Sequence, residues 1–87
     1  MEGSKVSAQA TEQTVINWLQ EVGGKVSGTP ITAETELLEN GVLDSVGILN
    51  LVSFLEGHFG FSVPFEDFVP ENFKTPTTIA AMVSRLV

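Results

Sequence analysis

Apolar residues recur at intervals of three and four positions in three segments of the chain, the spacing of helices that bury one face. The most regular segment follows Asp44 and carries Ile48, Leu51, Val52, Leu55 and Phe59. Asp44 is a typical N-cap, and Gly60 is typical of the left-handed residue that follows a helix end. We therefore expect the best-defined helix to lie between these two residues.

The region before this helix divides into a shorter helix and a long loop. A helix is predicted over about residues 11–22, because Val15, Leu19 and Val22 share one face and Gly23-Gly24 can end it. Residues 25–43 alternate turn formers with short apolar pieces and are predicted to form an ordered loop. We expect this loop to pack through its apolar side chains, Ile31, Leu37, Leu38 and Leu43.

The region after the best-defined helix is expected to end in another helix. Residues 61–74 contain Pro64 and Pro70, which leave room for only one or two helical turns. Thr75 is a typical cap, with Pro76 at the first helical position. Since no segment alternates as a half-buried strand does, the predicted fold class is all-α, with three main helices and one short one. The expected core consists of Val15, Leu19, Ile48, Leu51, Val52, Leu55, Phe59, Ile79 and Val83.

The composition indicates one small cysteine-free domain. Its 87 residues suffice for a single core, and the absence of cysteine excludes disulfides, thiolate metal sites and a cysteine nucleophile. The polar first thirteen residues are neither a signal peptide nor an anchor, and no segment approaches the roughly 20 apolar residues of a membrane span. We expect a cytoplasmic protein with a flexible segment at residues 1–10 and a domain at residues 11–87.

The charge of the chain is strongly negative, with 11 acidic and 4 basic residues and a net charge of −7. No lysine or arginine lies between Lys25 and Lys74, while that stretch holds Glu34, Glu36, Glu39, Asp44, Glu56, Glu66, Asp67 and Glu71. Such a field repels nucleic acids and anionic lipids and favours basic protein partners. Acidity that serves solubility alone is the alternative.

Side chains that could perform catalysis are scarce, so no catalytic or metal-binding residue is predicted. The single histidine, His58, lies near the end of the best-defined helix, where a structural role is favoured. Ser45 lacks the Gly-x-Ser-x-Gly frame of a serine hydrolase, and no phosphate loop or calcium loop is present. Asp44-Ser45 alone indicates capping, but a phosphodiester on this exposed hydroxyl would face a helix N-terminus, which favours anions.

The run ENGVLDSVGILNLV at residues 39–52 resembles the phosphopantetheine-attachment motif of acyl and peptidyl carrier proteins. Residues 59–64 and 69–80 are similar to later segments of that family, so the resemblance covers roughly residues 12–87. It implies a four-helix bundle of the acyl-carrier type. It also implies that Ser45 receives 4′-phosphopantetheine from coenzyme A and that the chain is a non-enzymatic carrier of acyl, aminoacyl or peptidyl thioesters.

The resemblance also implies a set of partner enzymes. A phosphopantetheinyl transferase would modify Ser45, an adenylating enzyme or acyltransferase would load the arm, and synthases or transferases with basic and apolar docking surfaces would unload it. The docking residues expected on this chain, which we expect to be a monomer, are Asp44, Val46, Leu49, Asn50, Glu66, Asp67 and Glu71.

One feature departs from the common pattern of the family, and Gly47 is unusual because glycine is unfavourable within a helix. Carriers of fatty-acid synthesis typically have several acidic residues along the helix after the serine, whereas Glu56 is the only one here before Phe59. This favours a discrete carrier of polyketide or nonribosomal-peptide biosynthesis that an adenylating enzyme loads. Gly47, in an exposed helical turn, permits either close approach of a partner or packing against the preceding loop. The alternative function is an unmodified acidic interaction module, which would tolerate Ser45→Ala.

Overall fold

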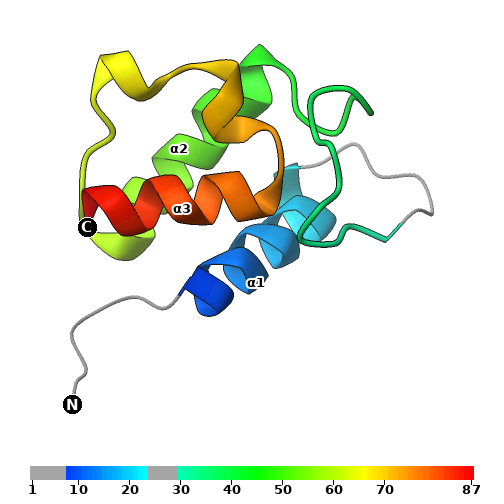
Figure 1. The fold of residues 1–87 in the computed structure, drawn as a ribbon, viewed down its shortest axis with the longest axis horizontal. Helices are drawn as coiled ribbons and strands as arrows, with labels where there is room; N and C mark the ends of the chain where they lie inside the picture. Colours follow the sequence, from blue (N-terminus) through cyan, green and yellow to red (C-terminus); the bar gives the residue numbers. More distant parts are fainter. Residues whose placement is uncertain (1–7, 24–29) are drawn as a thin grey trace.

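The computed structural model describes residues 8–23 and 30–87 of the chain, and these residues form helices joined by ordered loops (Figure 1). The elements in chain order are α1 (Ala8–Trp18), its π-helical extension η1 (Leu19–Gly23), α2 (Ser45–Phe59), the 3-10 helices η2 (Phe65–Asp67) and η3 (Pro70–Phe73), and α3 (Pro76–Leu86). The described residues include no strand, which confirms the all-α prediction. Two short 3-10 helices take the place of the single short helix expected there.

Helix α2 begins and ends at the predicted caps. The Asp44 carboxylate accepts a hydrogen bond of 2.8 Å from the Gly47 backbone N–H. At the other end Gly60 adopts a φ of 70°, and its N–H donates to the Glu56 carbonyl at 2.9 Å. Because a positive φ strains a residue with a side chain, glycine is the natural choice at this helix end.

Helix α1 begins at Ala8, three residues before the predicted start. Ala8, Gln9 and Ala10 form helices readily, but they include no large apolar residue that would mark a buried face. The predicted flexible segment therefore overlaps α1 at residues 8–10, and its remaining part lies outside the described residues. None of the helices within residues 8–23 and 30–87 is long and apolar enough to cross a membrane.

Helix α3 begins at a reciprocal pair of hydrogen bonds that the sequence predicts only in part. The Thr75 hydroxyl accepts from the Thr78 N–H at 3.2 Å, and the Thr78 hydroxyl accepts from the Thr75 N–H at 3.0 Å. Pro76 occupies the first turn, where its missing N–H costs nothing. This capping box fixes the direction in which α3 leaves η3.

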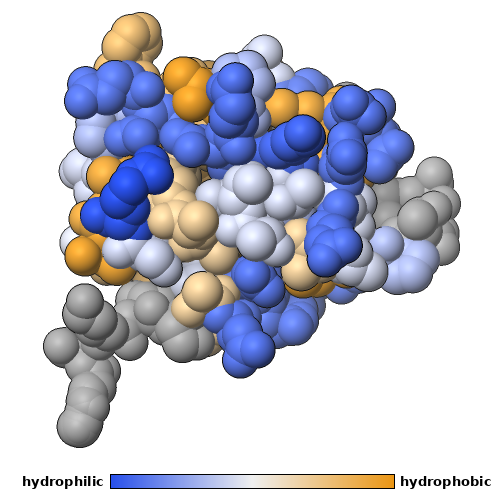
Figure 2. All heavy atoms as spheres, viewed as in Figure 1, coloured by the Kyte–Doolittle hydropathy of each residue, from blue (hydrophilic) through white to orange (hydrophobic). Residues whose placement is uncertain are grey.

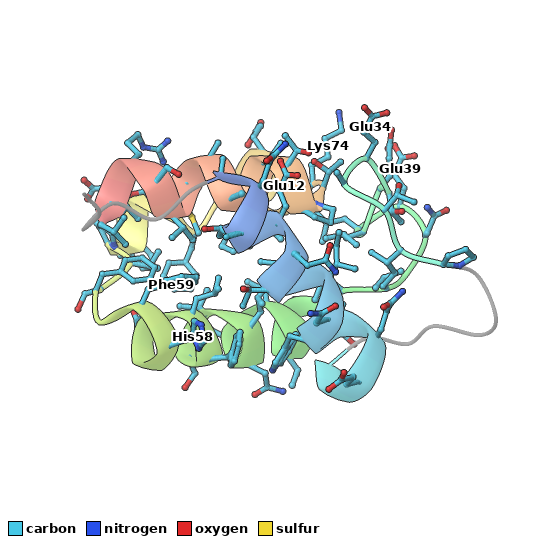
Figure 3. All side chains as sticks on the ribbon, turned by 90° about the horizontal axis from the view of Figure 1, so that it is seen from below. Glu12, Glu34, Glu39, His58, Phe59 and Lys74 are labelled. Atoms are coloured by element: carbon cyan, nitrogen blue, oxygen red, sulfur yellow. The ribbon has the colours of Figure 1, made fainter. Side chains whose placement is uncertain are left out.

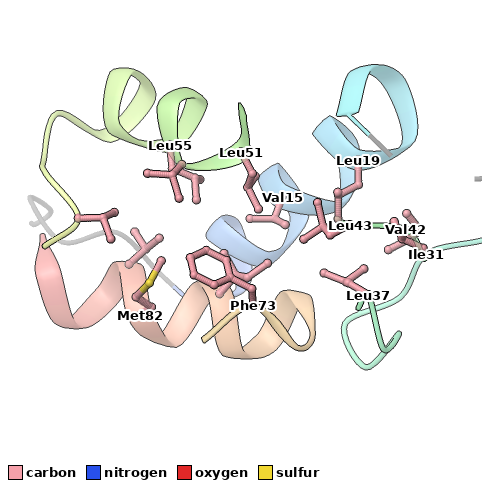
Figure 4. Close-up of a cluster of buried hydrophobic side chains, with 14 residues drawn as sticks. Val15, Leu19, Ile31, Leu37, Val42, Leu43, Leu51, Leu55, Phe73 and Met82 are labelled. Carbon is pink, nitrogen blue, oxygen red and sulfur yellow. The ribbon is translucent and has the colours of Figure 1, made fainter. Parts of the chain in front are cut away.

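The core lies between α2 and α3 and is closed by α1 (Figure 4). Seven of the nine predicted core residues are buried, but Ile48 and Phe59 are only half-buried, at its margin. Phe73 and Met82 are almost fully buried and were absent from that prediction. Phe73 follows two prolines in a segment without helical periodicity, so only the tertiary structure shows that it faces the core.

The loop before α2 packs against the rest of the domain, as expected. Ile31, Leu37 and Leu43 are buried and Leu38 is half-buried. The Leu37 N–H donates to the Lys74 carbonyl at 2.8 Å, and both the N–H and the hydroxyl of Thr77 donate to the Ala33 carbonyl, at 3.1 and 2.9 Å. The loop is thereby attached to the start of α3, and it holds the residues that precede Ser45 in place.

Candidate functional site

Ser45 is the first residue of α2, and its side chain is exposed. The neighbouring Asp44 has an extended backbone, with φ −121° and ψ −172°, and its carbonyl accepts the Ile48 N–H at 2.8 Å. The Asp44 carboxylate binds the Gly47 N–H, so the cap occupies one of the first-turn donors. The Ser45 hydroxyl therefore lies at the positive end of a 15-residue helix, where a negative group is stabilised.

An open, mostly apolar groove lies beside Ser45. It has a volume of about 530 Å³ and runs between the first turn of α2 and the η2–η3 segment. The residues that line it are Leu38, Asp44, Ser45, Ile48, Leu49, Phe68, Val69, Pro70 and Phe73. These residues come from three separate parts of the sequence, so the motif around Ser45 alone could not predict the groove.

Gly47 is buried, which corrects the prediction that it lies in an exposed turn. A Cβ atom at this position would lie 3.2 Å from the Asp44 Oδ1 atom and 3.2 Å from the Leu43 Cδ2 atom. Contacts this short require a neighbour to shift. Of the two interpretations of this glycine, the structure favours packing against the preceding loop.

The expected docking residues on α2 lie on its outer face. Val46 and Leu49 are 65% and 59% exposed, and Asn50 is exposed as well. Leu49 also lines the groove, so the exposed apolar surface continues from α2 into the groove. Asp44 is exposed beside Ser45, at the N-terminal edge of the same surface.

The three acidic docking residues expected beyond α2 have different surroundings. Glu66 and Glu71 are exposed, and Glu71 lies beside the groove together with Leu38 and Pro70. Asp67 instead accepts a hydrogen bond of 2.9 Å from the Arg85 guanidinium and another of 2.8 Å, through its backbone carbonyl, from the Asn72 amide. Asp67 therefore joins η2 to both α3 and η3. Its contact with Arg85 spans 18 residues, and the sequence pattern did not reveal it.

Acidic side chains outnumber basic ones in the loop before α2, at the start of α2 and in the η2–η3 segment. Figure 3 shows Lys74 at the same end of the molecule as Glu34 and Glu39. Between Lys25 and Arg85 this lysine is the only basic residue of the sequence. On the face drawn in Figure 2, hydrophilic side chains cover much of the upper edge, and apolar side chains appear between them. A partner that approaches the start of α2 and the η2–η3 segment therefore meets exposed apolar side chains with carboxylates beside them.

His58 lies at the opposite end of α2 from Ser45. Its ring stacks on Phe54, with centroids 5.3 Å apart, and meets the edge of Phe59 at 4.7 Å. Trp18 of α1 continues this stack beyond Phe54, at 5.8 Å. Within the described part of the chain, no three histidine, aspartate or glutamate side chains gather as metal ligands would.

The family of the chain follows from comparison with known proteins. The family model for the phosphopantetheine attachment site matches residues 14–83, which include all of α2 and every residue of the groove. The chain belongs to this carrier family. The resemblance of residues 39–52 to the attachment motif is therefore confirmed at the level of the family.

Several similar proteins are named as carriers. The D-alanyl carrier protein of Enterococcus faecalis is 33% identical over 75 residues, which cover 86% of this chain and 95% of that protein. D-alanyl carrier protein 2 of Lactiplantibacillus plantarum is 33% identical over 73 residues, 84% of this chain and 89% of that protein. The probable acyl carrier protein PigG of a Serratia species is 32% identical over 77 residues, 86% of each chain.

Membership in this family defines the class of function. The chain is a carrier domain to which 4′-phosphopantetheine attaches covalently, and such carriers are not enzymes themselves. Family members interact with a phosphopantetheinyl transferase and with the enzymes that load and use the arm. The surroundings of Ser45 fit this group, because a helix N-terminus can face its phosphate and an apolar groove adjoins the hydroxyl.

Proposed function

We propose that Ser45 is the attachment residue of this carrier domain. The observation that supports it is the exposed Ser45 hydroxyl on the first turn of α2, directly after the Asp44 cap and beside the groove. The other exposed serines of the described chain have different surroundings, because Ser53 lies in the middle of α2, Ser62 lies in a loop and Ser84 lies near the C-terminal end of α3. Residues 11–87 are the carrier domain in this proposal, in agreement with the family match to residues 14–83.

The attachment reaction needs little from the carrier beyond an accessible hydroxyl. The Ser45 oxygen would form a bond to the phosphorus of coenzyme A that carries the pantetheine, the pyrophosphate bond would break, and adenosine 3′,5′-bisphosphate would leave. The hydroxyl proton passes to a base of the transferase. Once attached, the arm supplies the thiol that holds the cargo, because the chain itself has no cysteine.

We propose an aminoacyl group as the cargo, loaded by an adenylating enzyme. The names of several similar proteins, which describe carriers of D-alanine, favour a small aminoacyl cargo. The pathway proposed for this chain is polyketide or nonribosomal-peptide biosynthesis, in which it serves as a discrete, monomeric carrier in the cytoplasm. D-alanine transfer to an acceptor is the second candidate, supported by the same names.

The outer surface of α2 supports recognition through apolar contacts. Val46 and Leu49 are exposed there, whereas the carboxylate of Glu56, the single acidic residue of α2, accepts the Val63 N–H at 2.8 Å. Glu71 adds negative charge beside the groove, and Glu66 adds negative charge on η2. We propose that loading and unloading enzymes bring basic and apolar docking surfaces to this edge.

The experiment that tests Ser45 is modification of the purified chain by a broad-specificity phosphopantetheinyl transferase with coenzyme A and magnesium. Intact-mass measurement is expected to show one added phosphopantetheine on the parent chain and none on Ser45→Ala. Ser53→Ala is the matched control, because it removes an exposed hydroxyl from the same helix. A folded parent chain that stays unmodified with several transferases would instead favour the unmodified interaction module.

The cargo is then tested on the modified chain. Candidate adenylating enzymes are supplied with ATP and a panel of amino acids that includes both enantiomers of alanine, and the mass of the loaded carrier is measured. An aminoacyl adduct that hydroxylamine removes supports an aminoacyl thioester. Loading by an acyltransferase with an acyl group, and with no amino acid, would contradict the proposed cargo.

A further inference from the structure

Most of the large exposed apolar residues in the described part of the chain belong to two segments. The five large apolar residues with high exposure in the described part of the chain are Val46, Leu49, Phe65, Val69 and Val87. The first four belong to the start of α2 and to the η2–η3 segment, which lie along the upper edge of Figure 1. Leu49 and Val69 line the groove beside Ser45, and η2, which carries Phe65, lies toward the other end of this edge from the start of α2. Single exposed apolar residues need no explanation, but those on these two segments offer one partner an apolar surface along this edge.

Phe65 is the most exposed member of this edge. Its exposure is 91%, whereas each of the other five phenylalanines of the chain is buried or half-buried. Phe68, three residues later, packs against Phe73 with ring centroids 6.2 Å apart. Phe65 therefore faces solvent, while Phe68, directly after η2, packs against the core.

The turn that carries Phe65 is held from several sides. The Asp67 N–H donates to the Pro64 carbonyl at 2.9 Å, and the Phe68 N–H donates to the Phe65 carbonyl at 3.1 Å. The Asp67 carboxylate is bound by Arg85 of α3. Because the turn is fixed in this way, its backbone loses little conformational freedom on binding, which favours a role of Phe65 as an anchor.

The size of an ordinary interface makes contact with η2 plausible for an enzyme that acts at Ser45. A standard interface covers roughly 800 Å² of each partner. The chain exposes 5149 Å² in total, so such a footprint around Ser45 takes a considerable share of one face. The groove already connects Ser45 to Val69, two residues beyond η2.

We propose that Phe65 is a docking residue for the phosphopantetheinyl transferase, where it enters an apolar pocket edged by lysine or arginine side chains. The basic edge follows from charge complementarity, since Glu66 is exposed beside Phe65 and Lys74 is the only basic residue between Lys25 and Arg85. This inference rests on the proposed function, because it takes Ser45 as the acceptor of the transferase.

The test is a steady-state measurement with a broad-specificity phosphopantetheinyl transferase, coenzyme A and increasing concentrations of the carrier. Phe65→Ser is expected to raise the KM for the carrier at least about fivefold, as loss of an anchor does, with little change in kcat. Phe65→Leu keeps an apolar side chain and is expected to retain most of the affinity. Since Phe65 is almost fully exposed, both variants are expected to unfold at the same denaturant concentration as the parent.

Matched controls separate docking from general changes of surface polarity. Val87→Ser removes an exposed apolar side chain at the C-terminal end of the chain, away from the start of α2 in Figure 1, and is expected to leave KM unchanged. Glu66→Gln is expected to raise KM and weaken its salt dependence, whereas Glu21→Gln, in the middle of η1, is expected to change neither.

The outcomes distinguish this inference from the proposed function. If the parent and Phe65→Ser are modified at Ser45 with equal KM, Phe65 is not a docking residue, although the carrier function stands. An equal rise of KM in Val87→Ser would also contradict the inference. If no transferase modifies Ser45 in the folded parent, the proposed function fails, and the inference fails with it.

Discussion

The two ends of α2 differ in what they contact. At its C-terminal end, Phe54 and His58 stack in series with Trp18, and the Glu56 carboxylate accepts the Val63 N–H. At its N-terminal end, Ser45 and Leu49 are exposed beside an open groove. Side chains at the C-terminal end of the helix therefore contact neighbours within the chain, whereas Ser45 and Leu49 at the N-terminal end remain accessible to partners.

This difference assigns the two ends of α2 different roles. Its middle and C-terminal end stabilise the domain, and its N-terminal end is available for recognition by partners. Contacts that fold the domain are concentrated in the middle and at the C-terminal end of α2, where Leu51 and Leu55 are fully buried. The N-terminal end contributes the Asp44 side-chain cap and the Ser45 hydroxyl, and its Val46 and Leu49 side chains are exposed. Substitutions at the two ends are therefore expected to affect different measurements.

The largest effect on stability is expected from Leu51→Ala, compared with Leu49→Ala. Leu51 is 0% exposed and Leu49 is 59% exposed, although they lie two residues apart on α2. Loss of the buried side chain should lower the free energy of unfolding by about 3 kcal/mol, and loss of the exposed one by less than about 0.5 kcal/mol. Urea denaturation followed by circular dichroism measures both. If both variants lowered the free energy of unfolding by the same amount, the contrast between the buried and the exposed face of α2 would be wrong.

A smaller effect is expected at the C-terminal end from Glu56→Ala. The half-buried carboxylate closes the turn after α2 by accepting the Val63 N–H at 2.8 Å. Loss of this charge-assisted hydrogen bond should cost about 1.5 kcal/mol, and Glu56→Gln, which keeps an acceptor oxygen, should cost less. Thermal and urea unfolding measure the difference. A stability unchanged in Glu56→Ala would show that this contact contributes nothing.

The smallest effect on stability is expected at the N-terminal end from Asp44→Ala. The variant loses the side-chain cap that accepts the Gly47 N–H, which should cost about 1 kcal/mol, while Asp44→Asn keeps a capping oxygen and should stay close to the parent. The same unfolding experiments measure both variants. If the asparagine variant lost as much stability as the alanine variant, the negative charge rather than the cap would be responsible.

The sequence predicts α2 well because several local signals agree. The same boundaries are indicated by the helical stripe of apolar residues, by the N-cap Asp44 and by Gly60 after the helix end. The resemblance to the attachment motif also predicts the family of the chain and Ser45 as the residue of the site. The start of α1 is predicted less well, because Ala8–Ala10 include no large apolar residue that would continue the helical stripe.

The surroundings of the site depend on contacts that local patterns do not contain. Helical spacing assigns Gly47 to the surface, but the Leu43 side chain of the preceding loop covers it. The acidic residues of the η2–η3 region look equivalent in the sequence, yet Asp67 pairs with Arg85 while Glu66 stays exposed. The groove requires Leu38, Leu49 and Phe68 to meet, which only the tertiary structure brings about.

The most direct test of Ser45 as the attachment residue is to locate the phosphopantetheine on the parent chain by fragmentation mass spectrometry after treatment with a transferase and coenzyme A. Ser53, Ser62 and Ser84 are exposed as well and serve as internal comparisons within the same molecule. We predict a single phosphopantetheine on Ser45 and none on the other three serines. Attachment at another residue, or a folded chain that no transferase modifies, would contradict the account.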